Sequence, residues 1–253
     1  MTTDTIPKAV SRQSEIEGKP FTITGVAKGA GMICPDMATL LGFIVTDAEF
    51  GDDSGFLQTA LKSGVGRSFN RITIDGDTST NDTVLMMANG MSGAVVTNPA
   101  HRTLFQKVLD EVLITLARML VKDGEGVTKL VDIAVKGAVS DDDALKIAST
   151  VANSSLVKTA LFGEDANWGR ILAATGRAQA YMRPEETDVY FDHVPVCQKG
   201  AGCGGQTETD ATRVLQKAKF TIGIDLNQGD GSATMLTCDF SLDYVRINAD
   251  YRS

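Results

Sequence analysis

The residues with the clearest chemical potential lie between two apolar, strand-like runs, 21–27 and 40–45. The string between them, 28–39 (KGAGMICPDMAT), is rich in small residues, and its glycines let backbone approach a ligand closely. A threonine hydroxyl is a weak nucleophile unless a base takes its proton. A free α-amino group on the same residue can do so, because it titrates at about 7.7–8.0. A cut between Ala38 and Thr39 would therefore create a nucleophile and its base together, although a threonine beside a strand is more often structural.

Other polar clusters fit known chemistries poorly. The segment 75–82 (DGDTSTND) has the alternation of a calcium loop, but it lacks glycine at the sixth position and has Met86 instead of glutamate at the twelfth. His193, Cys197 and Cys203 lack a fourth ligand at a suitable spacing. The sequence therefore predicts no metal site.

The string at 28–41 resembles the self-cleavage site of the ornithine acetyltransferase family, the bifunctional enzymes of arginine biosynthesis. The resemblance extends from Met1 to Ser253, because further strings match in the same order: 75–82 (DGDTSTND), 123–129 (DGEGVTK), 167–170 (NWGR) and 246–253 (RINADYRS). In this family the chain cuts its own peptide bond before the threonine of an Ala-Thr pair. The resemblance therefore implies cleavage between Ala38 and Thr39, with Thr39 as the catalytic nucleophile.

The resemblance also implies a set of substrate contacts, at Thr5, Lys28, Thr39, Glu125, Asn248 and Ser253. Lys28 would bind the carboxylate of an acylated amino acid, which suits a cation, and Glu125 would bind the amino group of ornithine. The choice of Thr5 over the neighbouring Thr2 and Thr3 depends on its spacing from Thr39. From the residue types alone, the ordinary interpretations are a solvated lysine, an acid in a helix-terminating turn, and frayed chain ends.

The implied reaction moves the acetyl group of N2-acetylornithine to glutamate through an acetyl-threonine intermediate, giving ornithine and N-acetylglutamate. Some family members also accept acetyl-CoA to make N-acetylglutamate, and the sequence leaves this open. Beyond acetyl-CoA as a substrate, no cofactor is expected. A related N-terminal-nucleophile aminopeptidase or amidase, in which water accepts the acyl group, is the alternative within the same chemistry.

Family members are longer than this chain. Their first part, which supplies the Thr-Gly pair of the oxyanion hole, has no counterpart here. Losing one oxyanion donor typically lowers the rate about 10²–10³-fold. A non-catalytic fragment that still binds ligand is therefore a third hypothesis, and we expect the chain alone to be weakly active or inactive unless the N-terminal part is supplied separately. The resemblance also implies a heterotetramer of cleaved chains.

The elements that must hold these residues predict an α/β (mixed α+β) fold. By resemblance it is a layered sandwich of the N-terminal-nucleophile aminopeptidase type with a smaller C-terminal α/β domain. The predicted segments are 1–38, the end of an α-chain-like segment, 39–124, the β-chain portion of the main sandwich, and 125–253, the C-terminal domain.

Periodicity and capping signals predict the individual elements. Residues 1–20 are predicted to form a flexible leading segment. The predicted helices are 52–61, a helix through 84–88, 99–122, 141–152, 156–162 and 167–180. The predicted strands are 21–26, 40–45 (buried on both faces), 71–75, 130–139, 189–191, 220–226, 233–239 and 241–248. Residues 200–205 are expected to form a surface loop, and 227–231 a hairpin turn between two strands.

The composition is that of a globular protein, with 253 residues, 43% hydrophobic and 22% charged. The net charge of −8 and the absence of a basic cluster argue against nucleic acid or an anionic membrane surface as partner. No apolar run approaches the length of about 18 residues that a membrane span needs. The polar start lacks a signal-peptide pattern, and the four cysteines read as reduced thiols, so a cytoplasmic protein is expected.

Overall fold

The computed structural model describes residues 3–34, 40–51, 54–78 and 81–250. The chain divides into two compact units, residues 1–123 (unit 1) and 124–253 (unit 2). Each unit combines a β-sheet with packed helices, so the predicted mixed α/β class is confirmed. The predicted segments 1–38, 39–124 and 125–253 depend on the cleavage and stay a prediction.

Unit 1 contains a sheet in the order β1-β2-β3-β4. Its strands are β1 (Lys8–Ile16), β2 (Lys19–Lys28), β3 (Leu41–Thr46) and β4 (Thr83–Ala88). β1 and β2 form an antiparallel hairpin in which Ile16 pairs with Lys19. The two turn residues, Glu17 and Gly18, both have positive φ, as a type I′ turn requires. β3 is antiparallel to β2 and parallel to β4. The parallel pair is joined through α1 (Ser54–Arg67) and the short 3₁₀ helix η1 (Phe69–Arg71).

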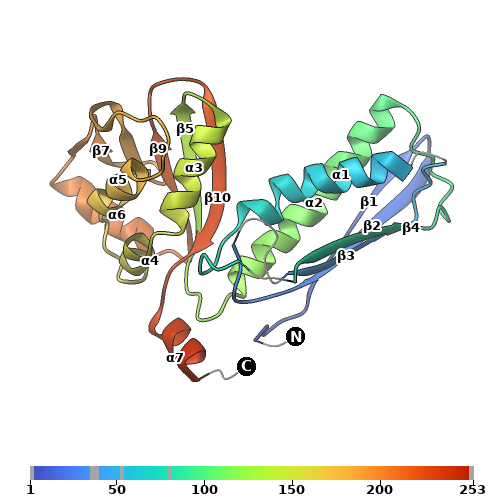
Figure 1. The fold of residues 1–253 in the computed structure, drawn as a ribbon, viewed down its shortest axis with the longest axis horizontal. Helices are drawn as coiled ribbons and strands as arrows, with labels where there is room; N and C mark the ends of the chain where they lie inside the picture. Colours follow the sequence, from blue (N-terminus) through green and yellow to red (C-terminus); the bar gives the residue numbers. More distant parts are fainter. Residues whose placement is uncertain (1–2, 35–39, 52–53, 79–80, 251–253) are drawn as a thin grey trace. The chain divides into compact units, whose positions relative to one another are not determined.

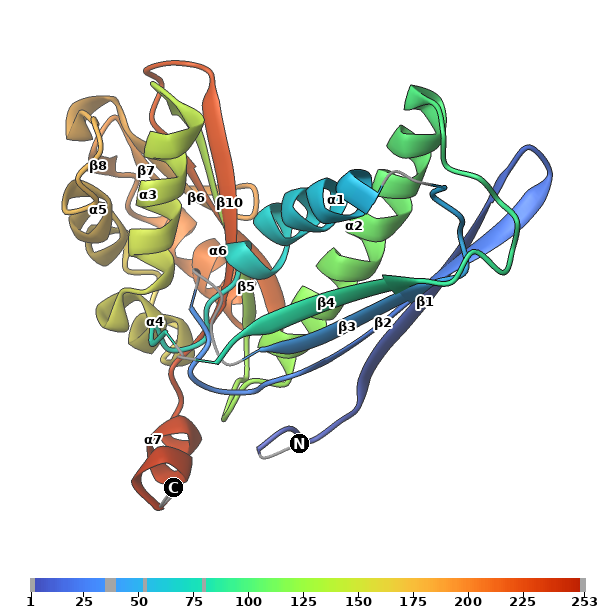
Figure 2. The same ribbon diagram turned by 45° about the vertical axis from the view of Figure 1, so that its right-hand side comes forward.

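The long helix α2 (Pro99–Lys122) fills the core of unit 1. It starts where the sequence predicts, because the side chain of Asn98 accepts a hydrogen bond from the backbone of His101 and proline occupies the first turn. Figures 1 and 2 show α1 and α2 covering one face of the sheet. Phenylalanine rings hold this layer together, with Phe105 at 5.9 Å from Phe21 and 4.9 Å from Phe50, measured between centroids.

The other face of the unit 1 sheet is apolar and exposed within this chain. Its exposed fractions are 42% for Val26, 41% for Phe43, 44% for Val45, 49% for Leu85 and 55% for Met87. Pairing aligns these residues across strands, since Val26 lies opposite Phe43, Phe43 opposite Leu85, and Val45 opposite Met87. The predicted burial of β3 on both faces is therefore wrong for this chain, in which only one face of the strand is covered.

Unit 2 contains a sheet in the order β10-β5-β9-β6-β7-β8. Its strands are β5 (Leu130–Ala138), β6 (Asp188–Phe191), β7 (Val194–Gln198), β8 (Ala201–Gly202), β9 (Lys219–Asp225) and β10 (Gly231–Cys238). Its helices are α3 (Asp141–Ala152), α4 (Ser155–Phe162), α5 (Trp168–Gly176), the 3₁₀ helix η2 (Pro184–Glu186), α6 (Gln206–Leu215) and α7 (Leu242–Asp250).

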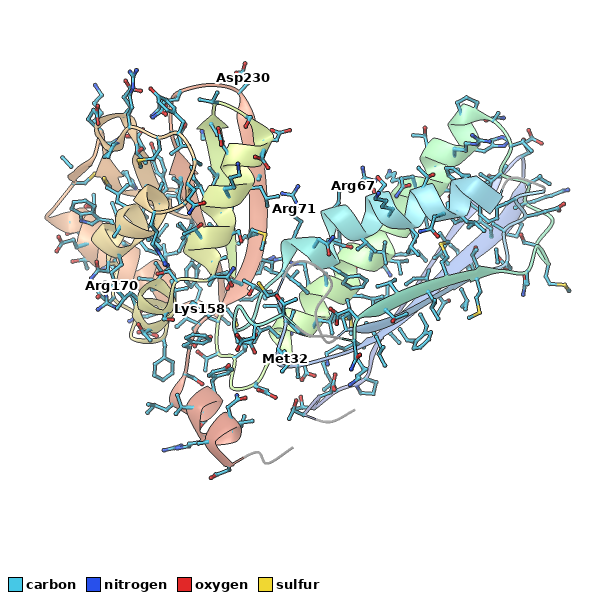
Figure 3. The ribbon with its side chains drawn as sticks, in the orientation of Figure 1. Met32, Arg67, Arg71, Lys158, Arg170 and Asp230 are labelled. Carbon is cyan, nitrogen blue, oxygen red and sulfur yellow. The ribbon has the colours of Figure 1, made fainter. Side chains whose placement is uncertain are left out.

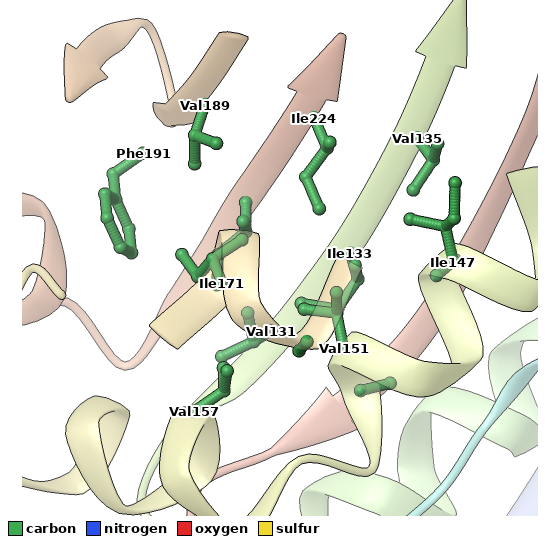
Figure 4. Packing of buried hydrophobic residues seen from close by; sticks show 14 of the residues in the cluster. Val131, Ile133, Val135, Ile147, Val151, Val157, Ile171, Val189, Phe191 and Ile224 are labelled. Atoms are coloured by element: carbon green, nitrogen blue, oxygen red, sulfur yellow. The ribbon is translucent and has the colours of Figure 1, made fainter. Parts of the chain in front are cut away.

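The core of unit 2 forms where α3 packs on the central strands. Figure 4 shows Val131, Ile133 and Val135 of β5 beside Ile147 and Val151 of α3. Every second residue of β5 points into this core, as expected for a sheet with helices on one face. Each such aliphatic side chain contributes about 1.5–3 kcal/mol when it is removed from water.

Trp168 covers part of the far end of the unit 2 sheet. It is the first residue of α5 and packs against the core. A Cβ atom at Gly202 in β8 would lie 2.8 Å from the indole ring, so the contact requires glycine there.

Three further predictions in unit 1 are wrong. Residues 8–16 form β1 instead of a flexible segment, because the hairpin with β2 compensates for their polar composition. Residues 83–88 form β4 instead of a helix, since β3 offers an in-register parallel partner. Residues 71–75 do not form a strand: Arg71 ends η1, Ile72 forms a single β-bridge, and the chain bends at Ile74 and Asp75.

Unit 2 also departs from the predictions. Residues 227–231 do not form a hairpin turn, because β9 and β10 lie on opposite sides of β5 and the loop crosses its end. Residues 242–250 form helix α7 instead of a strand, and α5 ends at Gly176 instead of near Ala180. Strand β7 and helix α6 were not predicted, and Ala201–Gly202 of the expected loop pair with β7.

Candidate active site

The predicted nucleophile Thr39, the cleavage partner Ala38 and the predicted contact Ser253 lie outside the described residues. Their roles stay predictions. The residues on both sides of the predicted cleavage loop are described, and so are Thr5, Lys28, Glu125 and Asn248.

The acidic segment 75–82 holds the chain on both sides of the predicted cleavage loop. Before the loop, the carboxylate of Asp75 accepts hydrogen bonds from the backbone N–H groups of Met32 (2.6 Å) and Ile33 (3.0 Å). After the loop, Oδ1 of Asp82 accepts from the N–H of Leu40 at 2.7 Å, and the N–H of Thr83 donates to the Leu40 carbonyl at 3.0 Å. The segment thus fixes the backbone at Met32, Ile33 and Leu40, close to the predicted cleavage site on either side.

Both of these aspartates sit in surroundings that disfavour charge. Burial raises the pKa of Asp75, and the backbone N–H donors from Met32, Asp77 and Ile33 offset this only in part. Burial likewise raises the pKa of Asp82 against the opposing effect of the Leu40 N–H. Oδ2 of Asp82 is buried and has no hydrogen-bond partner among the described residues. Asp82 also lines a small, mostly apolar cavity with Cys34 and Leu40.

Thr5 is held by Asp123, the residue that ends α2. The backbone N–H of Thr5 donates to Oδ2 of Asp123 at 3.1 Å, and its hydroxyl donates to Oδ1. Lys8 donates to the same carboxylate at 2.5 Å. Burial alone would raise the pKa of Asp123, but the hydrogen bonds from Lys8 and Thr5 and the charge of Lys8 outweigh it and lower the pKa.

Lys28 is the last residue of β2 and lies opposite Leu41 in β3, two residues after Thr39. It shares the open face of the sheet with Val26, since the two residues are two positions apart on one strand. Its ammonium makes no hydrogen bond or ion pair with any described residue. The next residue, Gly29, donates its N–H to Asp4 at 2.8 Å, so Asp4 and Thr5 connect the start of the chain to the end of β2.

In unit 2, the structure brings together two predicted contacts that are 123 residues apart in the sequence. Nδ2 of Asn248 on α7 donates to Oε2 of Glu125 at 2.9 Å. The same amide donates to the carbonyl of Tyr244 at 3.0 Å, which orients it along the helix. No described residue donates a hydrogen bond to Oε1 of Glu125, so this oxygen can accept one from a further donor.

Short polar contacts hold α7 beside the Glu125 turn. The hydroxyl of Ser241 donates to the Gly126 carbonyl at 2.6 Å and accepts from the N–H of Tyr244 at 3.2 Å, which caps the helix. A Cβ at Gly126 would lie 2.7 Å from the Ser241 hydroxyl oxygen, and Gly126 has a φ of +67°, so the turn requires glycine. Asp239 accepts hydrogen bonds from the backbone N–H groups of Thr128 and Lys129 and fixes the other end of the turn.

A buried lysine supports the segment that leads into α7. Lys158 of α4, labelled in Figure 3, is 1% exposed, and its ammonium donates to Oγ1 of Thr237 at 3.0 Å and to the carbonyl of Cys238. It also lies 4.6 Å from the ring centroid of Phe240. That ring stacks on Tyr244 of α7 with a centroid distance of 4.9 Å. The described contacts of Lys158 include no carboxylate.

The structure therefore joins the predicted contacts in two groups. Thr5 and the end of β2 with Lys28 belong to unit 1, and Glu125 and Asn248 belong to unit 2. The sequence did not identify Asp123, Asp75 or Asp82 as site residues. The only signal for them was their membership of the acidic strings 75–82 and 123–129.

The part of the chain that the structure describes has neither a metal-binding cluster nor a membrane-spanning helix. No group of three or more His, Cys, Asp or Glu side chains there could hold a metal ion, and no disulfide joins any of the four cysteines. No described helix is both long and apolar enough to cross a bilayer.

The fold defines a mixed α/β protein with an architecture like that of N-terminal-nucleophile enzymes, in which β2 and β3 precede and follow the predicted cleavage segment. A model of the ArgJ family matches residues 1–253, and the chain belongs to the ArgJ family.

Similar proteins agree with this assignment. The chain is 53% identical to the arginine biosynthesis bifunctional protein ArgJ of Syntrophotalea carbinolica and covers 64% of it. It is 48% identical to the mitochondrial ArgJ of Schizosaccharomyces pombe and covers 58% of it. In both alignments all of this chain is matched, so it spans about three-fifths of these relatives. A crystal structure of ArgJ from Bacillus halodurans superimposes with a TM-score of 0.78 at 39% identity, over 83% of this chain and 98% of that one.

Proposed function

We propose that this chain forms part of an acetyltransferase that moves the acetyl group of N2-acetylornithine to glutamate, in arginine biosynthesis. Thr39, freed by cleavage after Ala38, is the nucleophile. The observation that carries the proposal is the hydrogen bond between Glu125 and Asn248, because it assembles a carboxylate with an open acceptor from two distant segments that match one family.

The chemistry follows from an N-terminal threonine. The Thr39 hydroxyl attacks the acetyl carbonyl, and its proton passes to the α-amino group of the same residue. The C–N bond of the amide then breaks, and ornithine leaves with that proton on its amine. In the second half, the amine of glutamate attacks the acetyl-threonine ester, releases the hydroxyl and forms N-acetylglutamate. No cofactor enters this scheme. Acetyl-CoA is a further acetyl donor, which would acylate the free Thr39 hydroxyl to give the same ester and release the CoA thiol.

The remaining contacts bind the two charged ends of the substrate. Lys28 binds its α-carboxylate, since the ammonium has no partner among the described residues. Glu125 binds the side-chain ammonium of ornithine through Oε1, while Asn248 holds the other oxygen in place. Thr5 binds the acylated nitrogen, and Ser253 completes the contacts at the tail.

A further part of the family fold covers the open face of the unit 1 sheet. Val26, Phe43, Val45, Leu85 and Met87 are each more than two-fifths exposed there, and a contiguous apolar face of this kind normally marks an interface. The additional length of the relatives would supply this layer together with the oxyanion donors. A heterotetramer of cleaved chains and a cytoplasmic location complete the proposal.

The mass of the denatured chain tests the first step. We expect two species, residues 1–38 and 39–253, and a single uncut species for Thr39→Ala. Thr39→Ser is the matched control, because it keeps a hydroxyl nucleophile and should still be cut. Cleavage of Thr39→Ala at the same bond would contradict the assignment of the nucleophile.

Acetyl transfer distinguishes the three hypotheses. The chain should be assayed alone and together with the N-terminal part of a relative, with N2-acetylornithine and with or without glutamate. We expect N-acetylglutamate only when both parts and glutamate are present. Release of acetate at an equal rate without glutamate would favour the aminopeptidase or amidase alternative. No reaction in any combination would favour a ligand-binding fragment.

A further inference from the structure

Three charged side chains form a buried cluster in unit 1. The ammonium of Lys8 lies 2.6 Å from a carboxylate oxygen of Asp4 and 2.5 Å from one of Asp123. The exposed fractions of the side chains are 0% for Lys8, 2% for Asp4 and 4% for Asp123. Burying three charges is costly unless each one is paired and its remaining hydrogen-bonding capacity is used. The groups that donate hydrogen bonds to the remaining lone pairs of the two carboxylates therefore indicate what the cluster positions.

Each carboxylate of the cluster holds one segment of the proposed substrate site. Asp4 accepts the N–H of Gly29, the residue after Lys28. Asp123 accepts both the N–H and the hydroxyl of Thr5. One buried cation thus joins the two carboxylates that position the two proposed contacts of unit 1.

The contact with Asp123 also fixes the direction of the Thr5 hydroxyl. A hydroxyl has one proton to donate, and an ionised carboxylate can only accept. The low pKa of Asp123 keeps that carboxylate ionised. The Thr5 proton therefore points to Asp123, and only the lone pairs of the oxygen remain for a ligand.

We propose that Asp4, Lys8 and Asp123 are positioning residues, and that Asp123 makes Thr5 an acceptor for the amide N–H of an N-acyl amino acid. The inference rests on the proposed function, which places Thr5 against the substrate. The inference adds a basis for substrate specificity. An ester analogue has an oxygen in place of the amide N–H, so the lone pairs of that oxygen would face and repel the lone pairs of the Thr5 hydroxyl oxygen.

Asp123→Asn tests the direction of the hydroxyl. Among the described residues, Oδ2 of Asp123 accepts from both Thr5 N–H and Lys8, whereas Oδ1 accepts from the Thr5 hydroxyl alone. The amide oxygen of asparagine must therefore take the Oδ2 position, which places its NH₂ group against the Thr5 hydroxyl oxygen. The hydroxyl proton is then released toward the ligand, and the polarity of Thr5 is reversed.

The readout is the ratio of kcat/KM for N2-acetylornithine to kcat/KM for its ester analogue, 2-acetoxy-5-aminopentanoate. It should be measured in the assembled enzyme that carries out acetyl transfer. For Asp123→Asn we expect this ratio to fall about 10- to 100-fold relative to the unmodified protein, the usual effect of leaving a buried donor unmatched. A purely structural role would lower both kcat/KM values together and leave the ratio unchanged.

Two changes at Thr5 keep the test valid if Asp123→Asn folds poorly. Thr5→Val removes the acceptor and the hydrogen bond of the hydroxyl to Asp123, but it keeps all three charged side chains of the cluster, and it should lower the ratio by a similar factor. Thr5→Ser keeps the hydroxyl and should leave the ratio unchanged. In the double variant of Thr5→Val with Asp123→Asn, no further fall is expected, because both changes remove one interaction.

Asp110→Asn is the matched control, since Asp110 lies on the same helix but pairs with the half-exposed Arg67. It should leave the ratio unchanged. An unchanged ratio in both Asp123→Asn and Thr5→Val would overturn the inference. Failure of the proposed function itself would be seen separately, as acetyl transfer that persists in Thr39→Ala.

Discussion

The buried lysines Lys8 in unit 1 and Lys158 in unit 2 differ in their surroundings. Lys8 in unit 1 lies between the carboxylates of Asp4 and Asp123. Lys158 in unit 2 donates to the neutral oxygens of Thr237 and Cys238 and lies over the ring of Phe240. Both support a segment that carries proposed substrate contacts, the start of the chain in one case and the approach to α7 in the other.

The difference determines what each unit loses when its lysine is removed. In unit 1, two buried carboxylates would face each other without compensation. In unit 2, the acceptors would remain neutral, and one of them has another partner, since the Thr237 hydroxyl donates to the Ala152 carbonyl. Removing one side chain from a buried ionic cluster leaves unpaired charges and lowers the unfolding free energy strongly. Removing a lysine that contacts only neutral acceptors lowers it less.

The largest expected effect is that of Lys8→Met. Removing one member of a buried ionic cluster costs about 3–5 kcal/mol of unfolding free energy, because the charges left behind are uncompensated. Urea denaturation followed by far-UV circular dichroism measures this loss. Lys136→Met is the matched control, since Lys136 is 70% exposed in its pair with Asp225 and should matter little. A loss below about 1 kcal/mol for Lys8→Met would show that the cluster is not ionised as described.

Lys158→Met should cost less, about 1–3 kcal/mol, the usual penalty for leaving a buried acceptor without its donor. The same denaturation experiment applies, with the exposed Lys146 of α3 changed to methionine as the control. If Lys158→Met lowers the free energy of unfolding as much as Lys8→Met does, the surroundings of the two lysines do not determine the loss.

The smallest effect is a dependence on pH that Asp123→Asn should show and Lys158→Met should not. The pKa of Asp123 is lower in the folded protein than in the unfolded chain. Its contribution to stability is therefore complete above the unfolded value of about 3.9 and is lost as the pH falls through the folded value. The difference in urea midpoint between the unmodified protein and Asp123→Asn should shrink as the pH is lowered below about 4. The corresponding difference for Lys158→Met should stay constant, because no carboxylate is among its described contacts.

The sequence predicted well those elements that carry their own signals. Helix α2 has a continuous apolar stripe and an Asn-Pro start, and α3 has acids in its first turn. Strand β4 carries no such signal: its apolar run lacks alternation, and its identity depends on a parallel partner 42 residues earlier. Helix α7 has no buried residue, so it lacks the periodic stripe that would distinguish it from a strand.

The contacts within the candidate site, like β4 and α7, could not be predicted from local sequence patterns. Glu125 and Asn248 were found through resemblance, and their contact could not be derived from periodicity because it spans 123 residues. The importance of Asp123 was missed for a similar reason, since its partners Thr5 and Lys8 lie 118 and 115 residues away. Local patterns predict elements, whereas buried charges acquire their roles from partners that only the fold brings together.

The phenylalanine core of unit 1 has a practical consequence for detection. Residues 1–123 contain neither tryptophan nor tyrosine, whereas Trp168 and all four tyrosines lie in unit 2. Absorbance at 280 nm and tryptophan emission therefore report on unit 2 alone. A released fragment 1–38 would be invisible to a 280 nm chromatography detector, so a cleaved preparation could pass for an intact one unless peptide absorbance or mass is recorded.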